Sequence, residues 1–211
     1  KKIKLIATDM DGTLVNDAKE VPDSFAPWVL SHPDQQMVIA SGRPYYTNEE
    51  LFQGIKDHLI FIGDNGGLIY QQGQVLAKAG ITAEEAKFCL DLFKDEPGQS
   101  DSLRSQPGNL HDPKGDRNFL KQLDTYYIKR RYVEDLEAEV NSDEIIKFTV
   151  YIEGGAAESI YRQLPEMPGK LKRGLAGPEW IDIVNKDANK GAAVKKIADL
   201  KGIKQDEILA F

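Results

Sequence analysis

Two aspartates separated by one residue close an apolar run near the start of the chain, Asp9 and Asp11 in the stretch IATDMDGT. Two carboxylates this close repel each other unless a cation or a reacting group lies between them. Mg²⁺ meets that need, because it prefers hard oxygen ligands and takes one or two protein carboxylates while a phosphate and waters complete its shell. Asp9 could then act as a nucleophile toward phosphorus, and Asp11 could give and take a proton.

Gly12 and Thr13 follow the acids directly. Backbone N–H groups in a tight turn at this point could face the oxygens of a phosphate. The alternative is a purely structural turn, because Asp-Gly is a common turn pair and aspartate side chains form turns with their own backbone. On these residues alone both interpretations stay open.

A second polar group of residues ends another apolar run, in the stretch IASGRP. Ser41 and Gly42 precede Pro44, a residue favoured in the first turn of a helix. A hydroxyl and free N–H groups at a helix start form an anion site, whereas an ordinary helix cap is the alternative for Ser41. Arg43 is a candidate contact for a substrate anion, with a solvated surface arginine as its alternative.

The third signal is Lys190, in the stretch NKGAAVKKIADLKG. A lysine in the first turn of a helix opposes the helix dipole, at a cost of about 0.3 to 1 kcal/mol. If this helix begins at the sheet edge that carries Asp9, the ammonium can neutralise charge on the carboxylate and on a phosphate. The alternative is an exposed lysine without a special role. Asn65 is a further candidate, either as a substrate contact or as a residue that sustains a positive-φ turn.

Short apolar runs must position these residues. Runs at 3–8, 36–40 and 58–63, separated by segments with helical character, predict buried parallel strands joined by crossovers. This alternation predicts an α/β fold with a doubly wound, Rossmann-like parallel sheet, in which ligands bind beyond the carboxyl ends of the strands. The aspartates lie at such an end. The second of the crossover helices is expected over about 44–57, and a hairpin over 66–77.

The pattern changes to α+β in the middle of the chain and returns to the first pattern at the end. A helix over about 83–94 is followed by a stretch rich in turn formers, 95–115, which we interpret as a mobile surface loop. The sequence predicts a core over 1–79, an inserted α+β cap domain over 80–185, and a return to the core over 186–211. The remaining expected elements are helices over about 116–128, 155–164 and 189–202, and strands at 145–153, 171–177, 179–185 and 207–211.

Composition narrows the class of partner. The net charge is −7 with a pI near 5.1, so the long-range field repels nucleic acid and anionic membranes and favours a small molecule as the ligand. Apolar stretches stay shorter than the roughly 20 residues of a membrane helix. A single cysteine, Cys89, allows no internal disulfide, and no signal peptide is recognisable, so we expect a cytoplasmic protein. Nothing in the pattern specifies an oligomeric state.

Taken together, DMDGT at 9–13, SGRP at 41–44 and NKG at 189–191 resemble the haloacid dehalogenase-like (HAD) superfamily, and most closely its Cof-type sugar phosphatase branch. The segment GDNGGLIY at 63–70 is similar to the one that precedes the cap domain in that branch. The resemblance covers nearly the whole chain. It implies a Mg²⁺-dependent phosphatase that hydrolyses small phosphate esters through an aspartyl-phosphate intermediate.

The resemblance also implies a role for each matching residue. Asp9 would be the nucleophile and Asp11 the general acid and base, with Mg²⁺ held by the Asp9 side chain and the Asp11 backbone carbonyl. Ser41 and Lys190 would orient the phosphate. Two alternatives remain: a phosphomutase or phosphotransferase that uses the same aspartate, and a non-catalytic protein that binds phosphorylated metabolites.

In relatives an acidic loop of the G-D-x-x-N-D type follows the strand that matches EILAF, and its aspartate completes the metal shell. The strand at the end of this sequence lacks its following helix cover, so we expect the natural product to continue by about 50 to 60 residues, a length taken from the resemblance.

Overall fold

The computed structural model describes residues 2–105, 108–111, 116–141 and 145–211. The chain forms two compact units. Unit 1 comprises Lys1–Lys78 and Asp187–Phe211, and unit 2 comprises Ala79–Lys186. Unit 2 therefore lies in the chain between the two parts of unit 1.

Unit 1 is built on a sheet with the strand order β12-β1-β2-β3-β4-β5. The first four strands in this order run parallel, and β3, β4 and β5 are joined antiparallel. The three apolar runs predicted as neighbouring parallel strands are thereby confirmed. The strands are β1 (Leu5–Asp9), β2 (Gln36–Ala40), β3 (Leu59–Gly63), β4 (Leu68–Gln71), β5 (Gln74–Lys78) and β12 (Ile208–Ala210).

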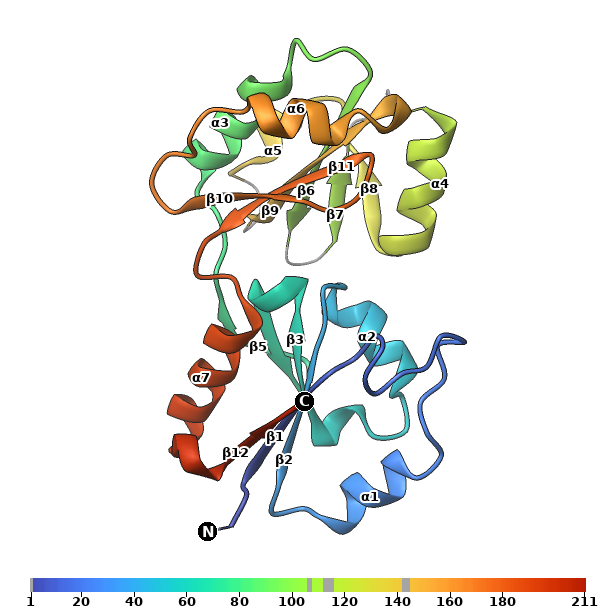
Figure 1. Ribbon diagram of the computed structural model, residues 1–211, viewed down its shortest axis with the longest axis vertical. Helices are drawn as coiled ribbons and strands as arrows, with labels where there is room; N and C mark the ends of the chain where they lie inside the picture. The colour runs from blue at the N-terminus through green and yellow to red at the C-terminus, as the bar shows by residue number, and fades with distance from the viewer. Residues whose placement is uncertain (1, 106–107, 112–115, 142–144) are drawn as a thin grey trace. The chain divides into compact units, whose positions relative to one another are not determined.

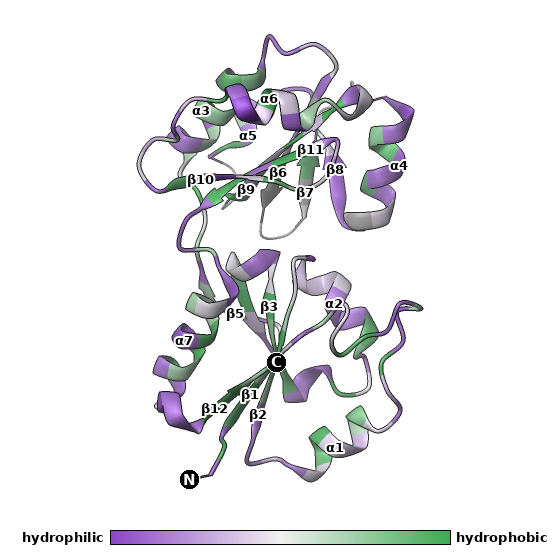
Figure 2. Cartoon of the chain, viewed as in Figure 1, coloured by the Kyte–Doolittle hydropathy of each residue, from purple (hydrophilic) through white to green (hydrophobic). Residues whose placement is uncertain are grey.

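Helices cover both faces of this sheet (Figure 1). On one face α1 (Phe25–Ser31) packs against the strands together with the chain that follows α2 (Tyr45–Leu51). On the other face α7 (Lys190–Lys201) packs through Ala193 and Ile197. The strands β1, β2 and β3 are buried on both faces and consist mainly of apolar residues, and Figure 2 shows green stretches in this sheet. The predicted doubly wound core is confirmed.

The helix predicted over 44–57 is shorter in the structure. It starts at Tyr45 and ends at Leu51, and a short 3₁₀ turn, η1 (Lys56–His58), precedes β3. Phe52 and Ile55 are buried in the core on this face of the sheet, so the chain turns inward here and does not continue along a helix axis.

Unit 2 contains a second sheet, with the strand order β10-β11-β9-β6-β7-β8. Its neighbours pair antiparallel except for β7 with β8. This pairing agrees with the α+β texture predicted for the middle of the chain. The strands are β6 (Gln99–Ser105), β7 (Asn109–His111), β8 (Arg130–Tyr132), β9 (Ile145–Ile152), β10 (Leu171–Leu175) and β11 (Trp180–Asn185).

Different helices pack on the two faces of the second sheet. The helices α3 (Ala83–Phe93), α5 (Leu136–Glu139) and α6 (Ala157–Gln163) contribute to one apolar cluster, and α4 (Arg117–Tyr126) contributes to another. Cys89 belongs to the first cluster and is fully buried, and this burial raises the pKa of its thiol to about 12. Cys89 is therefore part of the apolar core of unit 2.

The surface loop predicted over 95–115 is confirmed for residues 95–98, which form turns, but it is wrong for residues 99–105 and 109–111. Here β6 and β7 form a hairpin whose first strand pairs with β9, and Leu103 and Leu110 are buried. The polar composition of this segment concealed the hairpin, because some of its polar residues are buried. Ser102 is fully buried, and its hydroxyl donates to the Leu110 carbonyl at 3.2 Å. Residues 106–107 and 112–115 of that prediction lie outside the described residues.

Within the part of the chain that the structure describes, no helix combines the length and the apolar character needed to span a membrane.

Candidate active site

The two aspartates lie at the carboxyl end of β1, where the chain enters a tight turn. The strand ends at Asp9, and the carbonyl of Met10 accepts hydrogen bonds from the N–H groups of Leu14 at 3.1 Å and Val15 at 2.9 Å. The side chain of Met10 is fully buried. Because successive side chains of an extended segment point to opposite sides, this burial leaves both acids accessible, with 35% of the Asp9 side chain and 37% of the Asp11 side chain exposed.

Lys190 lies against the first of these acids. It is the first residue of α7, whose N-cap is Asn189, and the side-chain oxygen of Asn189 accepts from the N–H of Ala192 at 2.8 Å. The Nζ of Lys190 donates to Oδ1 of Asp9 at 2.5 Å. The carboxylate compensates the unfavourable position of the lysine at the positive end of the helix dipole. The expected contact across 181 residues of sequence is present, while its action on a phosphate stays a prediction.

The start of α7 is held in place by a turn after β3. Asp64, Asn65 and Gly66 all have positive φ angles, of 50°, 56° and 107°. A Cβ added to Gly66 would lie 2.4 Å from the carbonyl oxygen of Asn189. Only glycine permits this approach, so Gly66 sets the position of the helix end that carries Lys190.

We therefore expect Gly66→Ala to displace the start of α7 and to lower both stability and activity. Gly73→Ala is the matched control, because Gly73 has a φ of 75° but its nearest neighbour would be 3.9 Å away. Urea unfolding should show a loss for Gly66→Ala that exceeds the control by about 1 to 3 kcal/mol, the usual cost of overpacking. Equal losses in the two variants would show that the close approach has no effect on stability.

The polar residues after β2 adjoin the acids. The register pairs Asp9 with Ala40, so Ser41 follows beside the site. Ser41 is 2% exposed, and its Oγ accepts the N–H of Arg43 at 3.0 Å. The N-cap of α2 is Pro44, so Ser41 shapes the loop and does not cap the helix. Binding of a phosphate by Ser41 stays a prediction.

Arg43 and Asn65 have different places at the site. The Nη2 of Arg43 donates to Oδ1 of Asp11 at 2.9 Å, so the arginine contacts an acid of the pair. Asn65 sustains a positive-φ turn, its N–H donates to the Ser41 carbonyl at 3.0 Å, and its side chain would lie 3.1 Å from a Cβ on Gly42. Asn65 thus supports the Ser41 loop, and a substrate contact from it, from Gly42 or from Arg43 stays a prediction.

The backbone N–H groups of Gly12 and Thr13 are used within the turn. Gly12 has a φ of 76° and donates to the Val15 carbonyl at 3.1 Å, and Thr13 donates to the Met10 carbonyl at 3.4 Å. The interpretation of the Asp-Gly pair as a structural turn therefore accounts for the amide hydrogens of both Gly12 and Thr13. Phosphate binding at these two residues stays a prediction.

One residue at the site was missed in the sequence. The Nζ of Lys19 donates to Oδ1 of Asp11 at 2.8 Å, the same oxygen that Arg43 contacts. Burial pushes the pKa of the Asp11 carboxyl upward, but the hydrogen bond from Lys19 and the charge of Arg43 outweigh it and hold the pKa below its usual value. Spacing could not reveal Lys19, because the turn that directs it toward Asp11 has no motif of its own.

The oxygens at the site fit a magnesium ion by their chemistry. Lys190 occupies Oδ1 of Asp9, which leaves Oδ2, and the Asp11 backbone carbonyl lies in the turn that follows β1. Carboxylate and carbonyl oxygens are the hard donors that Mg²⁺ takes, with waters and a phosphate filling the other positions. Among the described residues no group of three or more His, Cys, Asp or Glu side chains could hold a metal.

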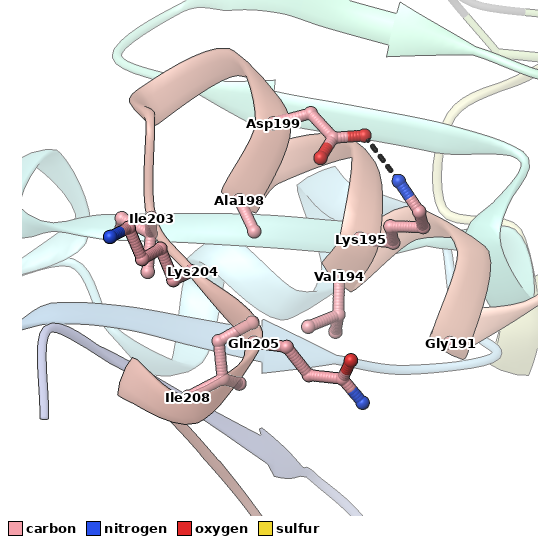
Figure 3. Close-up of a pocket in the computed structure, with 9 residues that line it drawn as sticks. All are labelled: Gly191, Val194, Lys195, Ala198, Asp199, Ile203, Lys204, Gln205 and Ile208. Atoms are coloured by element: carbon pink, nitrogen blue, oxygen red, sulfur yellow. Dashed lines mark hydrogen bonds and ion pairs between the residues drawn. The ribbon is translucent and has the colours of Figure 1, made fainter.

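A groove of about 730 Å³ lies elsewhere in unit 1, between α7 and the turn that leads into β12 (Figure 3). Its wall includes Val194 and Ala198, and an exposed ion pair joins Lys195 and Asp199 at 2.7 Å. The groove contains neither acid of the candidate site, so we do not assign the chemistry to it.

Known proteins resemble this chain over nearly its whole length. The model of the haloacid dehalogenase-like hydrolase family matches residues 6–211, and the chain belongs to that family. It is 23% identical to the 5-amino-6-(5-phospho-D-ribitylamino)uracil phosphatase YbjI of Escherichia coli, over 99% of this chain and 78% of the relative. A similarly named phosphatase of Bacillus subtilis, YcsE, is 24% identical over 99% of this chain and 76% of its own length.

Solved structures show the same fold. TM0651 from Thermotoga maritima has a TM-score of 0.85 at 21% identity, over 99% of this chain and 79% of that one. The HAD subclass IIB sugar phosphatase BT4131 has a TM-score of 0.76 at 22% identity, over 99% and 80%. Family membership makes the protein a hydrolase, and the names of its relatives place it among the phosphatases of the family.

Proposed function

We propose that the protein is a Mg²⁺-dependent phosphatase that hydrolyses small phosphorylated metabolites, in particular sugar phosphates, through an aspartyl-phosphate on Asp9. The contact between Asp9 and Lys190 carries this proposal. In this contact a cation lies directly beside a carboxylate at the end of a buried strand, which supports Asp9 as the nucleophile. A purely structural role would not explain Lys190, because a cation at the positive end of a helix dipole is unfavourable.

The chemistry proceeds in two balanced steps. In the first, an oxygen of Asp9 attacks phosphorus, the bond from phosphorus to the ester oxygen breaks, and Asp11 donates a proton to the leaving oxygen. In the second, water attacks the phosphorus of the aspartyl-phosphate and Asp11 takes a proton from it. Inorganic phosphate leaves, and the carboxylate of Asp9 is regenerated.

The charges around the acids support phosphoryl transfer. Lys190 contacts Asp9, and Lys19 and Arg43 contact Asp11, so three cations face two carboxylates. Charge on a phosphoryl group in transfer is spread over its equatorial oxygens, and fixed positive groups stabilise it. In this proposal Lys190 and the hydroxyl of Ser41 bind those oxygens.

Mg²⁺ would be held by the side chain of Asp9 and the backbone carbonyl of Asp11. Bound there, it would neutralise charge on the phosphate as a Lewis acid. We assign unit 2 the role of the cap domain that decides which ester is accepted, since closure of such elements excludes water and contributes to specificity. The names of the sugar phosphatase and the ribityl phosphate phosphatases among its relatives support a sugar or sugar-like ester as the substrate class.

A panel of sugar phosphates tests this proposal. The purified protein, supplied with Mg²⁺, should release inorganic phosphate from members of the panel and should stop when EDTA removes the metal. Adding back Mg²⁺ should restore the rate. A labelled acceptor sugar in the same assay separates hydrolysis from transfer, because a phosphotransferase would label the acceptor in place of releasing phosphate. Binding of the esters without turnover would contradict the proposal and favour a non-catalytic binding protein.

A further inference from the structure

We propose that Lys19 is a positioning residue that, together with Arg43, fixes the side chain of Asp11 so that one chosen oxygen exchanges the proton. This inference rests on the phosphatase function proposed above and deepens it, because it assigns a residue outside the family motifs to the acid and base step.

The geometry of the carboxylate carries the first part of the inference. Lys19 donates to Oδ1 of Asp11 at 2.8 Å, and Arg43 donates to the same oxygen at 2.9 Å. The two donors come from different segments, one from the turn after β1 and one from the loop after β2. Two donors converging on one oxygen restrict rotation of the carboxylate, and neither of them contacts Oδ2.

The backbone around Lys19 carries the second part. Lys19 has a φ of 62°, in the left-handed region that non-glycine residues rarely adopt. Hydrogen bonds within the turn hold this conformation. The carbonyl of Asn16 accepts from the N–H of Lys19 at 2.9 Å, and the side-chain oxygen of Asn16 accepts from the N–H of Glu20 at 2.9 Å.

A second bond closes the same turn, from Nδ2 of Asn16 to Oε2 of Glu20 at 3.0 Å. Strained residues held by their surroundings cluster at functional sites. Here the strain is held at the residue whose ammonium reaches Asp11, and glycine or asparagine would satisfy the backbone without supplying that cation.

An ordinary surface ion pair is the competing explanation. The Lys19 side chain is 51% exposed, and exposed pairs contribute little to stability. The two explanations make different predictions about catalysis. A surface pair predicts no kinetic effect when the ammonium is removed, whereas a positioning role predicts a loss that depends on how much the leaving group needs a proton.

Two substrates with different leaving groups separate these cases. p-Nitrophenyl phosphate releases a stable phenolate and needs little help from an acid, whereas an alkyl or sugar phosphate needs a proton on its leaving oxygen. We expect Lys19→Met to lower kcat/KM about 10- to 100-fold for the alkyl ester, a part of the usual contribution of general acid catalysis. The loss for p-nitrophenyl phosphate should be several times smaller, and Lys19→Arg should recover most of the lost rate.

Lys195→Met is the matched control, since Lys195 is also exposed and ion-paired, to Asp199 at 2.7 Å. It should keep the rates of the parent protein on both substrates. The unfolding midpoint of Lys19→Met should stay close to that of the parent, which excludes a folding defect as the cause.

The outcomes are distinguishable from failure of the proposed function. If Lys19→Met lowers kcat/KM equally on both esters, or on neither, the positioning role is wrong. The phosphatase mechanism would still stand in that case, provided that Asp9→Asn is inactive. Full activity in Asp9→Asn would overturn the mechanism itself, and the inference with it.

Discussion

Asp9→Asn is expected to lose phosphatase activity by roughly three to five orders of magnitude, the scale seen when a covalent nucleophile is removed. The amide is nearly the same size as the carboxylate, but it lacks the anionic oxygen that attacks phosphorus. It also removes the negative partner of Lys190. Release of phosphate from p-nitrophenyl phosphate and from a sugar phosphate, both with Mg²⁺ present, measures this loss.

Asp23→Asn is the control for this substitution, because Asp23 is exposed and lies beyond the turn that carries the acids. It should retain the activity of the parent protein. Comparable rates for the parent and Asp9→Asn would refute the assignment of the nucleophile.

Lys190→Met should lower kcat by about 10²- to 10³-fold, comparable to removing one stabilising donor from a charged transition state. The same substitution should leave the stability of the protein unchanged or raise it. The lysine opposes the helix dipole, so its removal should raise the free energy of unfolding by up to about 1 kcal/mol, offset by the lost contact with the half-exposed Asp9.

This combination of lower activity and unchanged or higher stability distinguishes a functional lysine from a structural one. Activity assays and urea unfolding on the same preparations provide both quantities. Lys196→Met, on the same helix and away from the acids, should change neither beyond small amounts. A variant at Lys190 that unfolds more easily and retains its kcat would contradict the account.

Much of unit 1 was predictable because its signals are local. Continuous apolar runs identify strands that are buried on both faces, and β2 begins and ends where its run does. The approach of Lys190 to Asp9 follows from topology, since the helix preceding β12 begins at the sheet edge where β1 ends. A long-range contact could be inferred here because regular elements placed both residues.

The sequence was less informative where side chains outside regular elements decide the structure. Lys19 reaches Asp11 through a turn whose shape depends on hydrogen bonds between Asn16 and Glu20. No periodicity encodes such bonds. The β6–β7 hairpin was missed for a related reason, because a buried polar residue such as Ser102 resembles a loop residue until its hydrogen-bond partner is known.

The central claim is that Asp9 carries the phosphoryl group during turnover. Rapid acid quenching of the protein with Mg²⁺ and a good substrate, followed by peptide mass spectrometry, tests it most directly. The account predicts one phosphoryl group on the peptide that contains Asp9, assigned to that residue by fragmentation and absent from Asp9→Asn. Turnover without any phosphorylated peptide, or a phosphoryl group on another residue, would contradict it.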